Sequence, residues 1–407
     1  MSHYEERRWT PDPNAPGGRR NREAFTYRAY VPGAIAEVDP QLSATAFKLV
    51  GEADQAVLEL NRDLPRVGGI EALARQLLRQ ESVASSRIEG LQMSQRRLAR
   101  AAMEIEFDDR ADTDAEAIMG NIRAMETAVT TTSAKSTLSI SDFIELHRTL
   151  LEATRDSHLA GWVRDRQNWI GGNNHNPRGA EFVPPPEGHV TRLLDDLAVF
   201  LNRRDLPATL QAAIAHAQFE TIHPFADGNG RVGRCLIHVA FRRAELAPSY
   251  VPPISLVLAT EAGDYVRGLT VFREGDVEDW CSYFAVKTLE ATRKARNLGA
   301  RVRTQQEEWI ERSGRPRRGS AALRLIELLS GQPVIDIRVA ARMTGASEEA
   351  ARRAVNQLVD AGILTQVTIG RRNRAWEARD VFELLNDFER ELATPEGADA
   401  PARAVPR

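Results

Sequence analysis

The 407-residue chain is predicted to be mostly α-helical, with one small β-hairpin near its middle and a C-terminal unit of three helices and two strands. Two observations predict the helical part and the hairpin. Apolar residues recur at the spacing of amphipathic helices from Ser43 to about residue 290. One irregular segment rich in Gly, Asn and Pro, residues 171–186, interrupts this pattern. A third observation sets off the C-terminal unit, because Gly314, Pro316 and Gly319 mark a boundary before it.

Composition restricts the class of protein. Hydrophobic residues make up 42% of the chain and charged residues 27%, close to the averages of globular proteins, and the length favours two or three domains. Two cysteines, Cys235 and Cys281, cannot build a disulfide framework, as is usual in a reducing compartment. The N-terminal residues lack the apolar segment of a signal peptide, and no later stretch is apolar enough to cross a bilayer. We therefore expect a cytoplasmic protein without a membrane partner.

Breaks in the apolar periodicity predict how the chain is divided into segments. The helical part begins with a face made by Phe47, Val50, Val57 and Leu58. We expect an extended N-terminal arm (residues 1–40), a helical module (41–135) and a helical core (136–290). A connecting helix with a linker (291–319), a C-terminal domain (320–392) and a disordered tail (393–407) are predicted to follow.

Short apolar segments flank the irregular stretch on both sides. Residues 168–170 read Asn-Trp-Ile before it, and residues 181–183 read Glu-Phe-Val after it. Such segments, separated by turn-forming residues, predict the small β-hairpin.

The segment from His223 to Arg234 reads HPFADGNGRVGR and predicts an anion site. An apolar helix must end near His223, because the residue before Pro224 is excluded from the helical region of backbone space. The following Asp-Gly-Asn-Gly run can direct successive backbone N–H groups at one point, and the next helix begins near Arg231 with its positive dipole end there. Arg231 and Arg234 share one face of that helix, so both can reach a polyphosphate.

This segment matches the pattern H-x-F-x-[DE]-G-N-G-R-x-x-R throughout and resembles the Fic family. Residues 166–172, 180–190 and 215–225 are similar to the core and flap of bacterial Fic proteins, and the likeness extends over residues 30–290. The resemblance implies a Fic helical core. It also implies that the β-hairpin is a flap, on which a target segment is laid as an added strand.

The resemblance also implies roles for the motif residues. His223 is expected to be the general base that deprotonates a target hydroxyl, and Asp227 to hold Mg²⁺ between the α- and β-phosphates of ATP. The remaining residues form or support the nucleotide site, with Phe225 anchoring the loop in the core: Phe225, Gly228, Asn229, Gly230, Arg231 and Arg234. The backbone of residues 228–230 and the Asn229 side chain are expected at the α-phosphate, and Arg231 and Arg234 at the β- and γ-phosphates.

The implied activity is protein adenylyltransfer, in which AMP moves from ATP to a Ser, Thr or Tyr hydroxyl of an unidentified target protein or of the enzyme itself. Removal of AMP by the same site is one alternative. Phosphoryl transfer is another, although the phosphorylating Doc relatives depart from the Gly-Asn-Gly-Arg run. A nucleotide-sensing regulator that binds DNA is a third, and a homodimer stays open.

The family also has an inhibitory pattern, [ST]-x-x-x-E-[GN], which Ser85 to Gly90 fit. The resemblance implies that Glu89 pairs with Arg234 at the site of the γ-phosphate, so that ATP binds only in a non-productive pose. Thr270 to Gly275 fit the same short pattern through Glu274. Glu89 is preferred, because an inhibitory helix before the motif suits an N-terminal module.

The order of elements in residues 320–378 resembles a winged helix-turn-helix domain. Residues 317–379 hold 11 Arg against six Asp plus Glu, an excess of five positive charges. Plausible phosphate contacts are Arg352, Arg353, Arg371, Arg372 and Arg374. DNA is therefore a candidate partner, beside a solvated basic surface or a docking module, because fold does not fix function.

Several residues near the motif are interpreted as structural. Gly228, Gly230 and Gly233 satisfy G-x-G-x-x-G, but a helix precedes them where a dinucleotide fold needs a strand. Cys235 is interpreted as a small core residue, and His216 and His238 as core or surface residues, not metal ligands.

Overall fold

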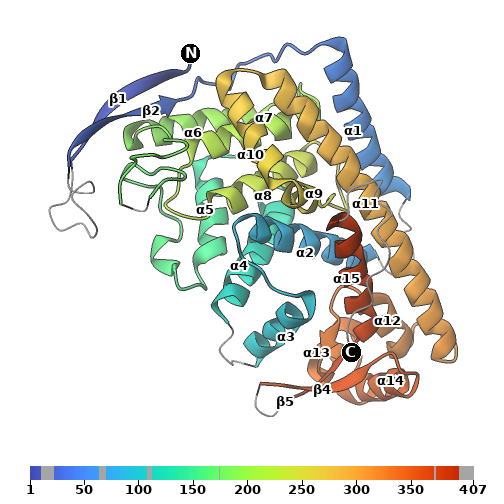
Figure 1. Ribbon diagram of the computed structural model, residues 1–407. Helices are drawn as coiled ribbons and strands as arrows, with labels where there is room; N and C mark the ends of the chain where they lie inside the picture. The colour runs from blue at the N-terminus through green and yellow to red at the C-terminus, as the bar shows by residue number, and fades with distance from the viewer. Residues whose placement is uncertain (11–22, 64–69, 108–111, 174, 371–372, 394–407) are drawn as a thin grey trace. The chain divides into compact units, whose positions relative to one another are not determined.

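The computed structural model describes residues 1–10, 23–63, 70–107, 112–173, 175–370 and 373–393 (Figure 1). The chain forms two compact units. The first comprises residues 1–63, 77–92 and 116–292, and the second residues 64–76, 93–115 and 293–407. Three helices contribute to both units: α2 (Ile70–Ile88), α4 (Thr113–Thr127) and α11 (Val277–Arg312). The segment predicted as one helical module over residues 41–135 is therefore shared between the units.

The first unit is almost entirely helical. It contains parts of α2, α4 (Thr113–Thr127) and α11. Its complete helices are α1 (Ala44–Asp63), α5 (Ile140–Leu151), α6 (Glu187–Asn202), α7 (Ala208–Ile222), α8 (Asn229–Arg243), α9 (Ile254–Thr260) and α10 (Ala262–Glu274). A π-helical turn (Ala128–Thr132) and a 3₁₀ turn (Ser157–Leu159) complete it.

Helices α7 and α8 form the centre of this unit, where they pack against each other. Every residue of α7 except Glu220 is buried, and its run of alanines lets α1, α6 and α8 approach closely. His216 and His238 are fully buried, His216 beside Tyr265 and His238 beside Glu81 at 2.9 Å. Cys235 and Cys281 are free and buried. These placements confirm the core interpretation of His216, His238 and Cys235.

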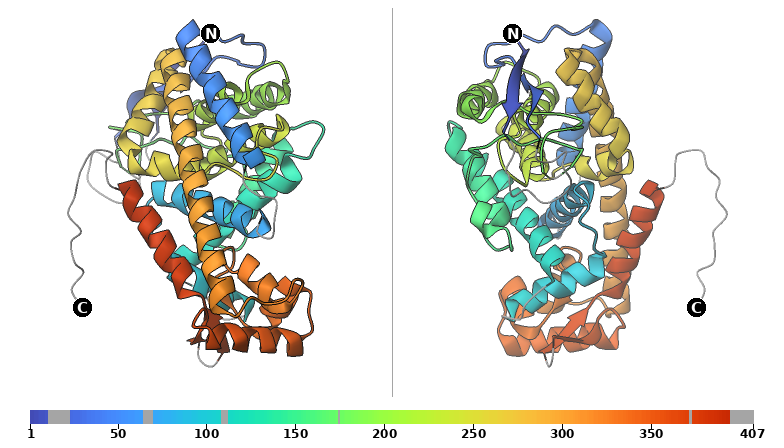
Figure 2. Two further views of the ribbon diagram at one scale, coloured as in Figure 1. Left: turned by 90° about the vertical axis from the view of Figure 1, so that its right-hand side faces the viewer. Right: turned by 60° about the vertical axis from the view of Figure 1, so that its left-hand side comes forward.

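The N-terminal arm contains a β-hairpin that was not predicted. Strands β1 (His3–Trp9) and β2 (Phe25–Val31) pair antiparallel in full register, and Figures 1 and 2 show the hairpin beside α6. Two residues of β1 contact two residues of α6: Arg7 lies 3.2 Å from Glu187, and Glu5 lies 2.8 Å from His189. The alternation of aromatic and polar residues in β2 was the local signal for a strand, and packing on α6 supplies the remaining stabilisation.

The predicted flap is shorter than a hairpin. Ile170 and Phe182 form an isolated antiparallel bridge, with Ile170 N–H donating to the Phe182 carbonyl at 2.8 Å. Gly171 and Gly172 follow with φ of +75° and +76°, which turns the chain out of the strand direction at once. The β2 strand lies next to this segment, because Tyr30 N–H donates to the Val183 carbonyl at 2.9 Å.

The second unit contains the C-terminal elements in the predicted order. They are α12 (Ala321–Leu328), a short β3 (Val334–Ile335), α13 (Ile337–Thr344), α14 (Glu348–Asp360), β4 (Thr365–Ile369), β5 (Asn373–Glu377) and α15 (Arg379–Ala393). The sheet order is β3-β5-β4, and β3 was not predicted. Ser347 caps α14 as predicted, accepting from Ala350 N–H at 3.3 Å, and Gly345 ends α13 with φ of +66°.

Helix α3 (Gln95–Glu106) belongs to the second unit, although it precedes the core by sequence. Its residues Arg96 and Arg100 pair with Glu377 at the end of β5, together with Arg379. Glu377 is fully buried, and three guanidinium partners lower its pKa although burial alone would raise it.

Two further findings concern surfaces. Phe47 and Leu58, expected on the buried face of α1, are exposed, whereas Val50 and Val57 are fully buried. Within the described ranges, no helix combines the length and apolarity needed to span a membrane.

Candidate active site

His223 ends α7 in a left-handed conformation. Its backbone has φ of +49°, and its N–H donates to the Phe219 carbonyl at 2.9 Å, which closes the last helical turn. Pro224 prevents the helix from continuing. The imidazole is 18% exposed, and burial, with Arg164 nearby, lowers its pKa to about 4. His223 is therefore neutral at pH 7 and can accept a proton.

A buried arginine holds the loop that carries His223. Arg164 donates from Nε to the His223 carbonyl at 2.8 Å and from Nη2 to the carbonyls of Ile222 at 3.3 Å and Pro185 at 2.6 Å. Nη1 adds the Arg166 carbonyl at 3.0 Å. Arg164 thus ties the end of α7 to both sides of the flap. It was missed from sequence, where the only local signal was one arginine after the apolar pair Trp162 and Val163.

Replacing Arg164 by Lys is expected to lower the free energy of unfolding by about 2–4 kcal/mol, because one ammonium cannot reach all four carbonyls. Urea titration measures the change. Arg166→Lys is the matched control, since the Arg166 side chain is 91% exposed. Equal stability of the two variants would show that Arg164 does not hold the loop.

Two asparagines fix the loop from inside. Asn229 accepts from Phe225 N–H at 2.8 Å and donates to the Phe225 carbonyl at 2.8 Å. Asn168 donates to the carbonyls of Phe225 and His223, both at 3.1 Å. In this structure the Asn229 side chain therefore shapes the loop by bonding both polar backbone groups of Phe225.

Phe225 is fully buried and stacks on His147, with ring centroids 3.8 Å apart and planes 2° from parallel. Nδ1 of His147 accepts from Gly161 N–H at 3.0 Å, so Nε2 carries the proton and donates to the Asp227 carbonyl at 3.1 Å. Burial lowers the pKa of His147 to about 4, which keeps this tautomer neutral. His147 was not predicted and supports the loop at Asp227.

Asp227 and Arg231 form the polar rim of the loop. The Asp227 carboxylate is 53% exposed, and its Oδ2 accepts from Arg231 Nη2 at 2.9 Å. The Nε of Arg231 is buried and makes no hydrogen bond within the described part of the chain. In the same described part, no group of three or more potential metal ligands exists. One carboxylate suits Mg²⁺ only when phosphate oxygens and water complete its coordination.

The first turn of α8 is shaped to receive an anion. Gly228 caps the helix with φ of +79°, and a Cβ there would meet Leu150 at 2.8 Å. At Gly230, a Cβ would lie 2.0 Å from Oε1 of Glu89 and 2.8 Å from Nη1 of Arg234. A carboxylate oxygen thus rests almost on the Gly230 backbone, where the helix N-terminus favours negative charge.

Arg234 binds Ser85 and Glu89, the first and fifth residues of the inhibitory pattern. Nη2 lies 2.7 Å from Glu89 Oε1 and 2.9 Å from the Ser85 carbonyl, and Nε donates to Ser85 Oγ at 2.8 Å. Arg234 is 1% exposed and Glu89 38%. Burial is the largest single influence and lowers the pKa of Arg234, but Glu89, Tyr265 and Glu220 together outweigh it and raise this pKa above its usual range.

The two glutamates that fit the short inhibitory pattern lie in different surroundings. Glu89 directly follows α2, and Gly90 turns the chain with φ of +83°. Glu274 is the exposed last residue of α10, and no ion pair joins it to the motif among the described residues. Tertiary packing thus brings Glu89 to Arg234.

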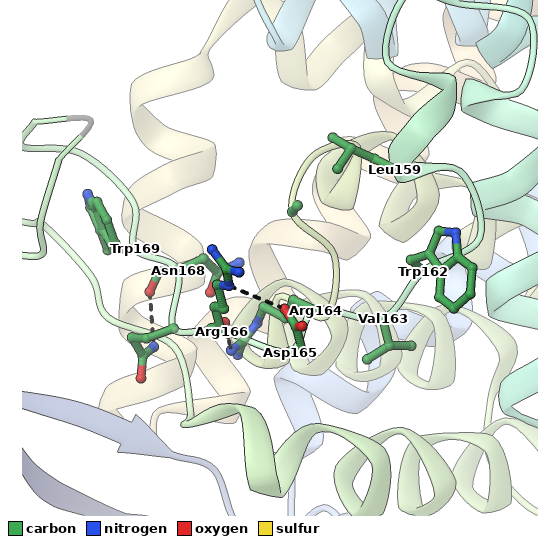
Figure 3. A pocket seen from close by; sticks show the side chains of 10 residues that line it. Leu159, Trp162, Val163, Arg164, Asp165, Arg166, Asn168 and Trp169 are labelled. Carbon is green, nitrogen blue, oxygen red and sulfur yellow. Dashed lines mark hydrogen bonds and ion pairs between the residues drawn. The ribbon is translucent and has the colours of Figure 1, made fainter. Parts of the chain in front are cut away.

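A pocket of about 850 Å³ adjoins the loop (Figure 3). Its walls are mainly apolar, and Trp162 is 71% exposed at its edge. The lining residues are Leu159, Trp162, Val163, Arg164, Asp165, Arg166, Gln167, Asn168, Trp169 and Ala226. Since Ala226 directly precedes Asp227, the pocket opens beside the motif.

The motif and its helical surroundings define the class of domain. Residues 137–241 match the model of the Fic/DOC family, and residues 47–130 match the model of the Fic/DOC family N-terminal region. Over these two stretches the chain is similar to the Fic/DOC family domain and to the N-terminal region that precedes it.

Individual relatives cover parts of the chain. The protein adenylyltransferase fic-1 of Caenorhabditis briggsae is 33% identical over 151 residues, which are 36% of this chain and 27% of that protein. The protein adenylyltransferase Fic of Drosophila grimshawi is 26% identical over 270 residues, 65% of this chain and 51% of that protein. A crystal structure of a Fic family protein from Desulfovibrio desulfuricans G20 shares the fold, with a TM-score of 0.50 and 18% identity over 83% of this chain and 97% of that one.

Proposed function

We propose that this protein transfers AMP from ATP to a hydroxyl of a target protein. The observation that carries the proposal is the arrangement of the motif: Asp227, Arg231 and Arg234 lie at or near the N-terminus of α8, and His223 ends the preceding helix α7. The names of the relatives, protein adenylyltransferases, support the same activity.

In this proposal the chain's own groups supply the catalysis. The neutral His223 takes the proton of the target hydroxyl as its oxygen attacks the α-phosphorus, and pyrophosphate leaves. Backbone N–H groups at residues 228–230 stabilise the negative charge on the α-phosphate, while Arg231 and Arg234 hold the β- and γ-phosphates. Mg²⁺ at Asp227 would neutralise phosphate charge.

We also propose that Glu89 inhibits the enzyme. Its carboxylate lies against Arg234 and the Gly230 backbone, a place suited to the γ-phosphate. ATP then competes with an anion of the protein itself.

Parallel incubations with α-labelled and γ-labelled ATP test the function. AMP transfer puts the α-label alone into protein, and phosphoryl transfer puts in the γ-label alone. An enzyme that only removes AMP would instead release label from prelabelled protein. No incorporation from α-labelled ATP, even without Glu89, would refute the proposal.

The C-terminal elements suit a winged helix whose third helix and wing carry arginines. Arg352 on α14 and Arg374 on β5 are exposed, and Arg353 pairs with Glu349. Arg371 and Arg372 lie outside the described residues. Exposed arginines on α14 and β5 favour duplex DNA as a second candidate partner.

If this surface binds DNA, neutralising Arg371, Arg372 and Arg374 together should weaken binding. The salt slope should fall by up to about three, since each lost phosphate contact removes about one. Titration of a fluorescent duplex at several salt concentrations measures both effects. No measurable affinity at low salt would leave a docking module as the explanation.

A further inference from the structure

Glu220 and the proposed base His223, both at the end of α7, each have a buried polar atom without a hydrogen-bond partner in the described part of the chain. Oε1 of Glu220 and Nδ1 of His223 make no hydrogen bond within the described ranges, although both are buried. Glu220 Oε2 lies 3.9 Å from Nδ1, because the residues are three apart at the end of α7. Buried polar atoms normally have partners, so this pair calls for a functional explanation.

The packing of α8 makes room for the Glu220 carboxyl. A Cβ on Gly233 would lie 3.0 Å from Glu220 Oε1, so a side chain there would press on the carboxyl. The Glu220 side chain is only 12% exposed, although the other residues of α7 are more deeply buried. Glu220 is thus largely enclosed, and it lies at the end of α7 next to His223.

Charged groups from several elements face this carboxyl. Burial is the main influence on Glu220 and, with Glu89, raises its pKa to about 7, while Arg234 and Arg273 oppose this. Arg273 also stacks over the flap residue Phe182 at 4.0 Å. The buried hydroxyl of Tyr265, which binds His216, faces the same group.

The charges around His223 differ from those around Glu220. Burial, followed by Arg164 and Arg273, lowers the pKa of His223, whereas the Glu220 carbonyl and Glu89 raise it. A carboxylate at Glu220 is therefore the group on α7 that can balance an imidazolium at His223.

We propose that Glu220 is a positioning residue for His223, whose Nδ1–H it accepts during AMP transfer. This inference rests on the proposed function and names a residue that the motif does not contain. With Nδ1–H held by Glu220, Nε2 keeps a lone pair for the target hydroxyl, and the carboxylate stabilises the imidazolium that forms.

The hydroxyl proton moves to Nε2 of His223, and the target oxygen bonds to the α-phosphorus. The bond from that phosphorus to the pyrophosphate oxygen breaks, and pyrophosphate takes the electron pair. Glu220 stays ionised and accepts the Nδ1–H hydrogen bond throughout.

The test is Glu220→Gln in a Glu89→Gly background, with Glu274→Gln as the matched control in the same background. Gln keeps the shape of a protonated Glu, so the melting temperature near pH 7 should change little. Incorporation of α-labelled ATP is measured from pH 5 to 9, with kcat and the KM for ATP determined at each pH.

We expect kcat of the Glu89→Gly parent and of the Glu274→Gln control to rise with pH as Glu220 ionises. The value of kcat rises, and does not fall, with pH because only the ionised carboxylate of Glu220 stabilises the imidazolium. In the Glu220→Gln variant this rise should be absent, and the plateau should fall by about tenfold to a hundredfold with an unchanged KM for ATP.

Other outcomes separate the two proposals. An unchanged kcat profile in Glu220→Gln, or a change confined to the KM for ATP, overturns the role of Glu220 while AMP transfer stands. A fallen plateau that keeps the pH-dependent rise also overturns it, since the role would then be structural. Absence of label in the Glu89→Gly parent refutes the proposed function itself.

Discussion

Glu89→Gly is expected to raise self-labelling with α-labelled ATP by about tenfold or more over the parent. A hydrogen bond to a charged group contributes about 1.5–3 kcal/mol, and about 1.4 kcal/mol corresponds to a factor of ten in binding. Because Glu89 is 38% exposed, solvent weakens its pair with Arg234, and the lower end of that range applies.

The control for this prediction is charge reversal at Glu274, which fits the same short pattern at the exposed end of α10. It should leave labelling unchanged. Glu89→Gln adds a second measurement, since it removes the charge and keeps the shape. If Glu274→Arg raises labelling and Glu89→Gly does not, the inhibitory group follows the motif in the chain.

His223→Ala is expected to abolish labelling, with a fall of at least about a hundredfold, because general-base catalysis contributes that much. The fold should survive, since the imidazole is partly exposed and fills little of the core. The measurement is labelling in the Glu89→Gly background together with a thermal melt. Equal labelling of mutant and parent would exclude His223 as the base.

His223→Asn is the matched variant. The position has φ of +49°, a left-handed conformation that Asn tolerates better than Ala. Asn cannot accept the proton, so it should be as inactive as Ala. Activity in Asn but not in Ala would point to loop geometry as the function of His223.

Helix positions and the turn at the motif followed from local sequence. Pro224 ends α7 by its effect on the residue before it, and Ser347 caps α14 through its own side chain. These effects act over a few residues, so periodicity and turn chemistry were sufficient. The same reasoning predicts an anion site at the start of α8.

The strands depended less on local sequence. Alternation in β2 was visible, but strand formation required packing on α6 and pairing with β1, which lies some twenty residues away in sequence. Conversely, the flap segments were predicted as a hairpin and keep a single bridge, because the glycines after Ile170 leave the strand conformation.

By itself, the sequence determined the helical class, the C-terminal order of elements and the residues of the motif. Only the tertiary structure decided which groups surround that motif. Arg164 reaches the His223 carbonyl across 59 residues of chain, and Arg234 reaches Glu89 across 145. No local pattern encodes such partners, because they depend on how α2, the flap and α8 pack. Burial determined the protonation of two side chains, because desolvation makes His223 neutral and Glu220 hard to ionise. Burial is a property of the folded chain alone.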